Sequence, residues 1–200
     1  MDQDELHIPC FPLSIMLLPG EQTYLHLFEP RYKQLLHDVL SGDRTFVIPF
    51  VDEGQMSTLG TKVKVQKVLK TYPGGESDIL IEAVEVVRLL SIETQLDDRL
   101  YPGGVARSVS LQVSEPIEAE LLERFKEFEL ERGNTRRGYD YLPTVDLYSI
   151  ARGLNLSSED KYRLIKMSFN QKQRFLIKQI EYLSLLHEQE DGVFKNFYLN

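Results

Sequence analysis

The sequence predicts an α+β protein: an antiparallel β-barrel body with one early helix, followed by a C-terminal helical bundle. Residues 11–40 indicate a strand, a turn, a second strand and an amphipathic helix, and short alternating strands separated by turns fill most of residues 45–113. The composition then changes at Ser114-Glu115-Pro116, after which apolar residues recur at helical spacing. We therefore expect a β-barrel subdomain over residues 1–113 and an α-helical subdomain over residues 114–200.

The early helix has the clearest local signals. A turn at Pro19-Gly20 precedes a short β-prone run, Tyr24 to Phe28, and the helix should open at Glu29-Pro30, because proline is tolerated in a first turn where its missing N–H has no partner. The helix should end at Ser41-Gly42. The apolar stripe between these signals consists of Tyr32, Leu35, Leu36, Val39 and Leu40.

The strands of the body are predicted from alternation and turn chemistry. Pro49 interrupts the first run, which places that strand at an edge or a bulge. Glu82 and Glu85 mark a break or a polar face between two later runs. The expected strands are residues 45–51, 61–72, 78–85, 86–96 and 105–113, with turns at Tyr72-Pro73-Gly74-Gly75 and Tyr101-Pro102-Gly103-Gly104.

Four helices are expected in the remainder. Ser114 is the predicted N-cap of the first, which stops at Gly133, and the polar segment 134–140 should be a loop that tolerates motion. The second should start around Pro143, the third at the capping-box-like Ser157-Ser158-Glu159-Asp160, and the fourth should span about 170–188. We expect the aromatic tail at 194–198 to dock on the body or to fray. The predicted inward residues are Ile117, Leu121, Phe125 and Phe128, then Leu147, Tyr148, Ala151 and Leu154, then Tyr162, Ile165 and Phe169, then Leu176, Ile180 and Leu183.

Several ordered motifs resemble the N-terminal, substrate-binding domain of the Lon protease family. They are Pro9-Cys10-Phe11-Pro12-Leu13, Leu18-Pro19-Gly20, the run from Leu25 to Tyr32, and Leu59-Gly60-Thr61. Ser149-Ile150-Ala151, Leu154 to Ser157, Lys161 and Gln173 to Leu176 are similar to the helical half of that domain. Cys10 replaces a usual aliphatic residue, and Thr23-Tyr24 replaces a commoner Leu-Pro.

This resemblance implies a PUA-like fold for the barrel, with both subdomains forming one Lon N-terminal-like unit. In the family the helices continue into an ATPase, and proteolysis uses a serine and a lysine in a separate C-terminal domain. The chain has neither part, so we expect no enzyme activity. The sequence also lacks a GxxxxGK[ST] phosphate loop, a GxSxG elbow and an HExxH pair.

The charge and hydropathy of the sequence limit the classes of partner that we expect. The formal net charge of −8 opposes binding to nucleic acid and to anionic lipid. No apolar stretch of about 18 residues is present, and the acidic start is unlike a signal peptide, so we expect a cytoplasmic protein without membrane contact. The basic residues of 152–178 form a solvated helix surface or bind an anionic partner.

No cofactor or metal site is expected. The histidines, His7, His26, His37 and His187, are scattered and form no short-spaced ligand pair with Cys10. Cys10 lies in an apolar strand and is interpreted as a small core residue. A single cysteine also excludes an internal disulfide.

Five residues are candidates for peptide binding. Glu29, Arg31 and Tyr32 surround the start of the early helix, where Arg31 and the helix amides could hold a peptide backbone or an acidic group. The competing interpretation is structural: an ion pair between Glu29 and Arg31, with Tyr32 packed inside. Tyr72 and Tyr101 begin the two Tyr-Pro-Gly-Gly turns, where proline and glycine serve the turn and an exposed tyrosine could contact a ligand.

These observations favour a non-catalytic substrate-recognition domain that binds unfolded or damaged polypeptide segments, or an adaptor for a protease or ATPase partner. The first alternative is an RNA-binding module, since PUA-like barrels often bind RNA, although the acidic balance opposes it. The second is a small-molecule binding protein or an unrecognised enzyme with a pocket between barrel and helices.

Overall fold

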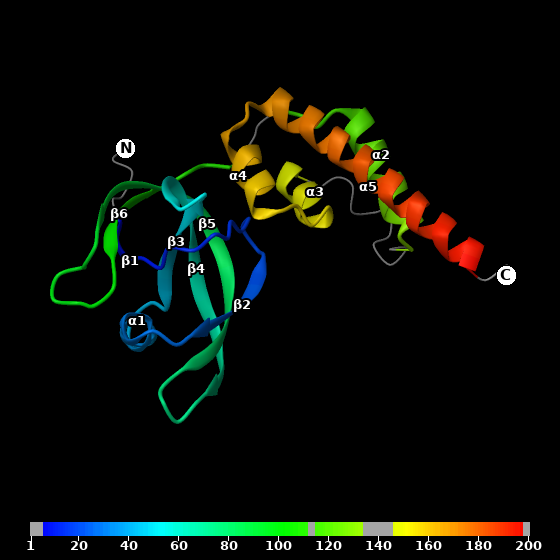
Figure 1. Cartoon of the computed structure of the whole chain (residues 1–200). Helices are drawn as coiled ribbons and strands as arrows, with labels where there is room; N and C mark the ends of the chain where they lie inside the picture. Colours follow the sequence, from blue (N-terminus) through cyan, green and yellow to red (C-terminus); the bar gives the residue numbers. More distant parts are fainter. Residues whose placement is uncertain (1–5, 112–114, 134–145, 198–200) are drawn as a thin grey trace. The chain divides into compact units, whose positions relative to one another are not determined.

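The computed structural model describes residues 6–111, 115–133 and 146–197 (Figure 1). Internal contacts divide the chain into two compact units, which are described one at a time. The first unit contains the residues up to Leu111 together with Ser157–Tyr162, and the second contains the rest. The predicted subdomain boundary at residues 113 and 114 lies outside the described residues and stays a prediction.

Six strands of the first unit form one antiparallel sheet in the order β1-β6-β5-β4-β3, with β2 also paired to β5. The antiparallel sheet predicted from the alternating runs is confirmed. The strands are β1 (Leu6–Pro9), β2 (Gln22–Leu27), β3 (Thr45–Asp52), β4 (Gln55–Thr71), β5 (Ser77–Glu93) and β6 (Gly103–Ser108).

The chain that follows β1 returns to the far edge of this sheet. Two isolated parallel bridges join Cys10 to Val47 and Leu13 to Phe50. The Phe11 N–H donates to the Val47 carbonyl at 2.8 Å, and the Val51 N–H donates to the Leu13 carbonyl at 2.9 Å. These bridges are not a continuous ladder, so the closed barrel stays a prediction.

Helix α1 (Pro30–Leu40) covers the core of the first unit. Tyr32, Leu35, Leu36 and Val39 are buried as predicted and pack with Phe46, Ile48, Val63, Val65, Ile79 and Ile81 of the sheet. Leu40 is only partly buried. Glu29 is the N-cap residue, and Pro30 occupies the first turn, as the sequence indicates.

The Leu59-Gly60-Thr61 segment lies within the long strand β4 and contacts both β3 and the chain before β2. A Cβ at Gly60 would lie 2.6 Å from the Ile48 carbonyl oxygen, so only glycine allows β3 and β4 to approach there. The Thr61 hydroxyl donates to the Leu17 carbonyl at 2.9 Å, and the Leu17 N–H donates to that hydroxyl at 3.3 Å. Both residues are buried, so the pair is satisfied internally.

The prediction of two strands over residues 78–96 is wrong, because β5 is continuous. Glu85 pairs with Lys62 and Ala83 pairs with Val63, so Val84 is an extra residue on β5. This bulge leaves Val84 exposed and shifts the alternation, which made one strand look like two. A register shift between Pro49 and Val51 likewise confirms the irregularity predicted at Pro49.

The start of helix α4 (Ser158–Lys166) belongs to the first unit. The Ser157 hydroxyl oxygen accepts from the Asp160 N–H at 3.1 Å, so Ser157 caps the predicted capping-box-like start of this helix. Ser158 accepts from the Met16 N–H, Tyr162 accepts from the Ser57 hydroxyl, and Lys161 pairs with Glu21 at 2.9 Å. These contacts fix the first turn of α4 on the sheet.

The second unit contains α2 (Ala119–Glu131), α3 (Leu147–Gly153), α5 (Phe169–Phe197) and the end of α4. The Gln173 side chain joins α5 to the start of α2, since its Oε1 accepts from the Glu118 N–H at 2.6 Å. With α1, five helices are present in the described residues. Their arrangement as a bundle stays a prediction.

Two boundary predictions and several burial predictions in the helices need correction. Helix α2 starts at Ala119 with Glu118 as N-cap, not at Ser114, because Pro116 lies in the non-helical approach. Helix α5 continues to Phe197, through the tail that was expected to dock or fray. The predicted inward residues that are only half-buried are Ile117, Phe125, Tyr162, Phe169 and Leu183, whereas the others are buried. The predicted loop at 134–140 and the start at Pro143 lie outside the described residues.

Candidate functional site

The five residues predicted for peptide binding differ in exposure: Tyr32 and Tyr101 are buried, and the other three reach the surface. Glu29 and Arg31 remain at the surface, where Arg31 Nη2 lies 2.8 Å from Glu29 Oε2. The Arg31 guanidinium also lies over the Tyr32 ring, 4.6 Å from its centroid. This pair matches the structural interpretation considered for the sequence, and both side chains remain partly accessible.

Tyr32 and Tyr101 are buried and present no surface to a ligand. The Tyr32 ring packs 3.9 Å from the Phe11 ring, between centroids. The Tyr101 hydroxyl donates to Asp38 Oδ2 at 2.8 Å, and burial, followed by the hydrogen bond to Asp38, raises the pKa of Tyr101 to about 12. The expectation of an exposed Tyr101 is therefore wrong, since only 2% of this residue is accessible.

Tyr72 is the predicted tyrosine that stays at the surface, and it belongs to a polar and aromatic cluster. Its hydroxyl donates to Asp78 Oδ2 at 2.8 Å, while His26 Nδ1 lies 2.6 Å from Asp78 Oδ1. The His26 ring meets the Tyr72 ring edge-on at 5.8 Å. Lys70 Nζ lies 4.2 Å from the centroid of the Tyr72 ring, within the range of a cation–π contact.

The cluster continues along β2. Tyr24 is 70% exposed and Phe28 is 60% exposed, and the Phe28 ring stacks on His26 at 6.0 Å. Residues 24 and 26 share one side because side chains alternate along a strand, whereas Leu27 on the other side is buried. Phe28 directly follows β2 and joins this side through its stacking on His26. We call Tyr24, His26, Phe28 and Tyr72 the aromatic face.

Strand register extends the aromatic face across three strands. Tyr24 pairs with Leu80, which pairs with Lys67, and His26 pairs with Asp78, which pairs with Lys70. Lys67 and Lys70 are exposed. The face therefore combines aromatic rings at its β2 side with ammonium groups at its β4 side.

Beside the aromatic face, β2 has a free edge: within the described residues, β5 is its only partner strand. The Ala83 N–H donates to the Glu21 carbonyl at 2.8 Å, so the carbonyl of residue 21 points towards β5. Because main-chain groups alternate in direction along an antiparallel ladder, we infer that those of Thr23 and Leu25 also point towards β5. The N–H and C=O groups of Tyr24 and His26 consequently point away from β5.

The electrostatics of the cluster favour an ionised Asp78. The hydrogen bond from His26, followed by that from Tyr72, lowers the pKa of Asp78. Nearby, the hydrogen bond from Lys33 lowers the pKa of Glu76, which the ammonium meets at 2.7 Å. Both carboxylates therefore stay charged at neutral pH and hold the hairpin between β4 and β5 in place.

The described residues contain no group of His, Cys, Asp and Glu side chains that could hold a metal ion. Cys10 is fully buried, and burial raises the pKa of its thiol to about 12, so it stays protonated as the core residue that was expected. No helix in the described ranges is long and apolar enough to cross a membrane.

Sequence reasoning selected Tyr72 but missed the rest of the aromatic face and Asp78. The signal was present in the alternation of Gln22, Tyr24, His26 and Phe28, which puts large or polar side chains opposite Leu25 and Leu27. Asp78 had no local signal, because its partners come from other strands.

Comparison with known proteins identifies the family. The family described as ATP-dependent protease La (LON) substrate-binding domain matches residues 7–188. The Lon N-terminal domain protein from Xanthomonas campestris is similar in structure, with a TM-score of 0.64 and 18% identity over 90% of this chain and 98% of that one. The N-terminal domain of the Mycobacterium avium complex Lon protease is also similar in structure, with a TM-score of 0.62 and 14% identity over 88% of this chain and 98% of that one. Curated sequences give no significant match. Since the family match spans most of the sequence, this chain belongs to the Lon substrate-binding domain family.

Proposed function

We propose that the chain is a non-catalytic recognition module that binds extended segments of unfolded or damaged polypeptides at the free edge of β2. The observation that carries this proposal is the aromatic face beside main-chain groups of Tyr24 and His26 that no other described strand pairs. Membership of the Lon substrate-binding domain family supports polypeptide as the ligand class.

The two parts of the site suit an unfolded ligand. An added strand would bond the main chain of β2 whatever its sequence, because every residue except proline carries both a donor and an acceptor. Tyr24 and Phe28 would then contact apolar side chains, which folded proteins bury. Recognition would therefore depend on exposure of a segment and only loosely on its sequence.

A binding assay with a permanently unfolded, fluorescent protein tests this function. We expect saturable binding in the range of about tens of micromolar, and no binding of a folded control. The double substitution Tyr24→Ser with Phe28→Ser should weaken binding about tenfold or more. Met56→Ser with Leu90→Ser is the matched control, because both residues are about as apolar and are 46% and 45% exposed outside the aromatic face. Equal losses in the two double variants would contradict the proposal.

RNA is a second candidate for the same surface, because Lys64, Lys67 and Lys70 are exposed on β4 beside aromatic rings. Asp78 and Glu82 lie between those lysines and β2, which opposes a phosphate backbone. An RNA oligomer measured at two salt concentrations separates the two functions, since RNA binding should fall steeply with salt. Salt-sensitive RNA binding without polypeptide binding would replace our proposal.

Three finer statements remain part of the proposal. They are a PUA-like closed barrel, an adaptor role towards a protease or ATPase, and a cytoplasmic location. The barrel is supported by the two parallel bridges from the chain after β1 to β3. The adaptor role would need a second surface, one that does not compete with the edge of β2.

A further inference from the structure

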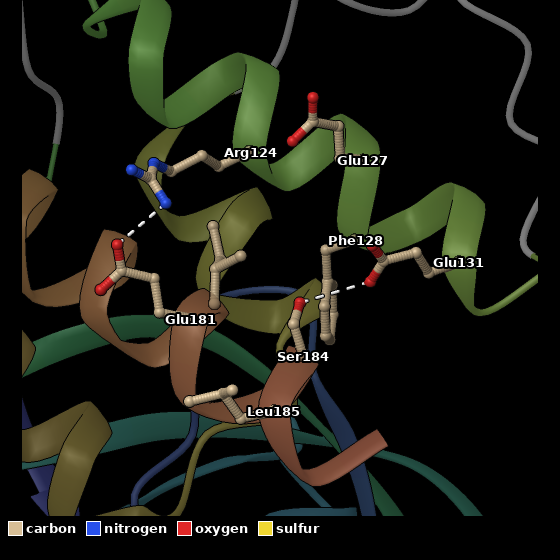
Figure 2. A pocket seen from close by; sticks show the side chains of 8 residues that line it. Arg124, Glu127, Phe128, Glu131, Glu181, Ser184 and Leu185 are labelled. Carbon is tan, nitrogen blue, oxygen red and sulfur yellow. Dashed lines mark hydrogen bonds and ion pairs between the residues drawn. The ribbon is translucent and has the colours of Figure 1, made fainter. Parts of the chain in front are cut away.

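The second unit has a groove between α2 and α5 (Figure 2). Buried Phe128 and Ile180 lie beneath it, and Leu185 lines it while 58% exposed. Two contacts cross between the helices: Arg124 Nη1 lies 2.8 Å from Glu181 Oε1, and the Ser184 hydroxyl donates to Glu131 Oε2 at 3.4 Å. The groove is thus an apolar strip bounded by polar contacts.

The charge around this groove is mainly acidic. Among the described side chains, Glu127, Glu131 and Glu181 line it together with one cation, Arg124. Arg124 is already occupied, because it also meets Glu120 at 3.0 Å. Arg132 stacks on Phe128, 5.2 Å from the ring centroid. Glu127 is exposed and has no ion-pair partner in the described part of the chain.

We propose that this groove binds a basic amphipathic helix of a partner protein. Its walls are helices, whose main-chain groups bond internally, so the groove offers an extended peptide no ladder. A helix satisfies its own main chain and can place an apolar stripe against Leu185 and Phe128. Lysine or arginine beside that stripe would pair with Glu127 and Glu131, which complements the acidic rim.

Two labelled helical peptides test this inference. They carry the same leucine stripe, and their outer faces are either lysine-rich or glutamate-rich. The lysine peptide should bind the full chain about tenfold or more tightly than the glutamate peptide in fluorescence anisotropy. Leu185→Ser should weaken binding of the lysine peptide about tenfold, and Glu127→Gln should weaken it about threefold. Leu185 and Glu127 are exposed, so folding should survive and circular dichroism checks it.

Matched controls separate docking in the groove from general attraction to an acidic protein. Leu130→Ser removes an exposed leucine of α2, and Glu123→Gln removes an exposed carboxylate of the same helix. Neither residue lines the groove. Both control variants should bind the lysine peptide with the affinity of the unmodified chain. Equal binding of the two peptides, or equal losses in test and control variants, would overturn the inference.

A second copy of the chain is the other conceivable occupant, and sedimentation distinguishes it. A dimer that Leu185→Ser dissociates would overturn the proposal of a basic helix from a partner protein. The Tyr24→Ser with Phe28→Ser variant should bind the lysine peptide unchanged, because those residues lie in the first unit. Loss of polypeptide binding at β2 and loss of helix binding at α2 and α5 are therefore separate outcomes.

Discussion

Each unit of the molecule buries one lysine and one tyrosine in a polar contact, but the partners differ. In the first unit, Lys161 meets the Glu21 carboxylate at 2.9 Å and Tyr101 donates to the Asp38 carboxylate. In the second unit, Lys172 donates to the Tyr148 hydroxyl at 2.8 Å, and no carboxylate pairs with Lys172 among the described residues. The buried lysine of the first unit is therefore paired with a carboxylate, whereas the buried lysine of the second unit meets a neutral hydroxyl.

The two surfaces differ in a corresponding way. The free edge of β2 offers main-chain groups that no other described strand pairs, which suit an extended polypeptide. The groove between α2 and α5 offers side chains alone, which suit a preformed helix. Apolar exposure by itself does not define a ligand; the state of the main chain beneath it decides which shape can bind.

The largest expected effect is the loss of the Glu21 carboxylate. Glu21→Ala leaves the Lys161 charge buried without its partner, so the free energy of unfolding should fall by about 3–5 kcal/mol. The Glu21 side chain also accepts from the Leu18 N–H at 2.7 Å, and that contact is lost as well. Urea denaturation measures the change.

The double variant Glu21→Leu with Lys161→Met is the control, since it removes both charges. It should recover most of the lost stability. A single Glu21→Ala variant with unchanged stability would show that Lys161 is adequately hydrated, and the contrast between the units would then disappear.

A smaller effect is expected for the buried tyrosine of the first unit. Tyr101→Phe removes a hydrogen bond to a charged group and should lower the free energy of unfolding by about 1–2 kcal/mol at pH 7. The pKa of Tyr101 is raised from 10.0 to about 12 in the folded protein, so the folded state favours the protonated tyrosine. Its contribution is present below pH 10 and is lost as the pH rises from 10 towards 12.

Urea titrations at several alkaline pH values check this sign. The difference between the unmodified chain and Tyr101→Phe should shrink across that window. Tyr148→Phe is the parallel case in the second unit, where burial also raises the pKa of the tyrosine to about 12, so its difference should shrink across the same window. If the difference in free energy of unfolding between the unmodified chain and Tyr101→Phe grew with pH, the expected pH dependence would be contradicted.

The smallest effect concerns Lys172. Burial lowers the pKa of Lys172, which means that its environment disfavours the ammonium. Lys172→Met keeps the volume and removes the charge, so the free energy of unfolding should rise by about 1 kcal/mol. Exposed Lys178→Met is the control, with a change near zero. A loss of several kcal/mol for Lys172→Met would show that its contact with Tyr148 is a major source of stability.

Local chemistry made part of the fold predictable. Pro30 and the 3.6-residue stripe located α1, and Ser157 with Asp160 located the start of α4, because each signal acts within one or two turns. The continuity of β5 was missed because a bulge at Val84 changes the face of the residues that follow it. Pairing to Lys62 and Val63 determines that bulge, and no local pattern encodes it.

The candidate site was less predictable than the fold. Tyr72 and Tyr101 begin identical turn sequences, yet one is at the surface and the other is buried against Asp38. The difference arises from packing partners that are distant in sequence. The aromatic face was encoded in the alternation of β2, but its free edge follows from which strands pair.

The most direct test of strand addition at β2 uses one apolar peptide that binds the chain and two versions methylated on alternate main-chain nitrogens, at odd or at even positions. In an added strand only every second N–H faces β2. One methylated version should therefore bind about tenfold or more weakly, while the other binds like the parent peptide. Equal affinities of the two methylated versions would contradict strand addition at the free edge of β2.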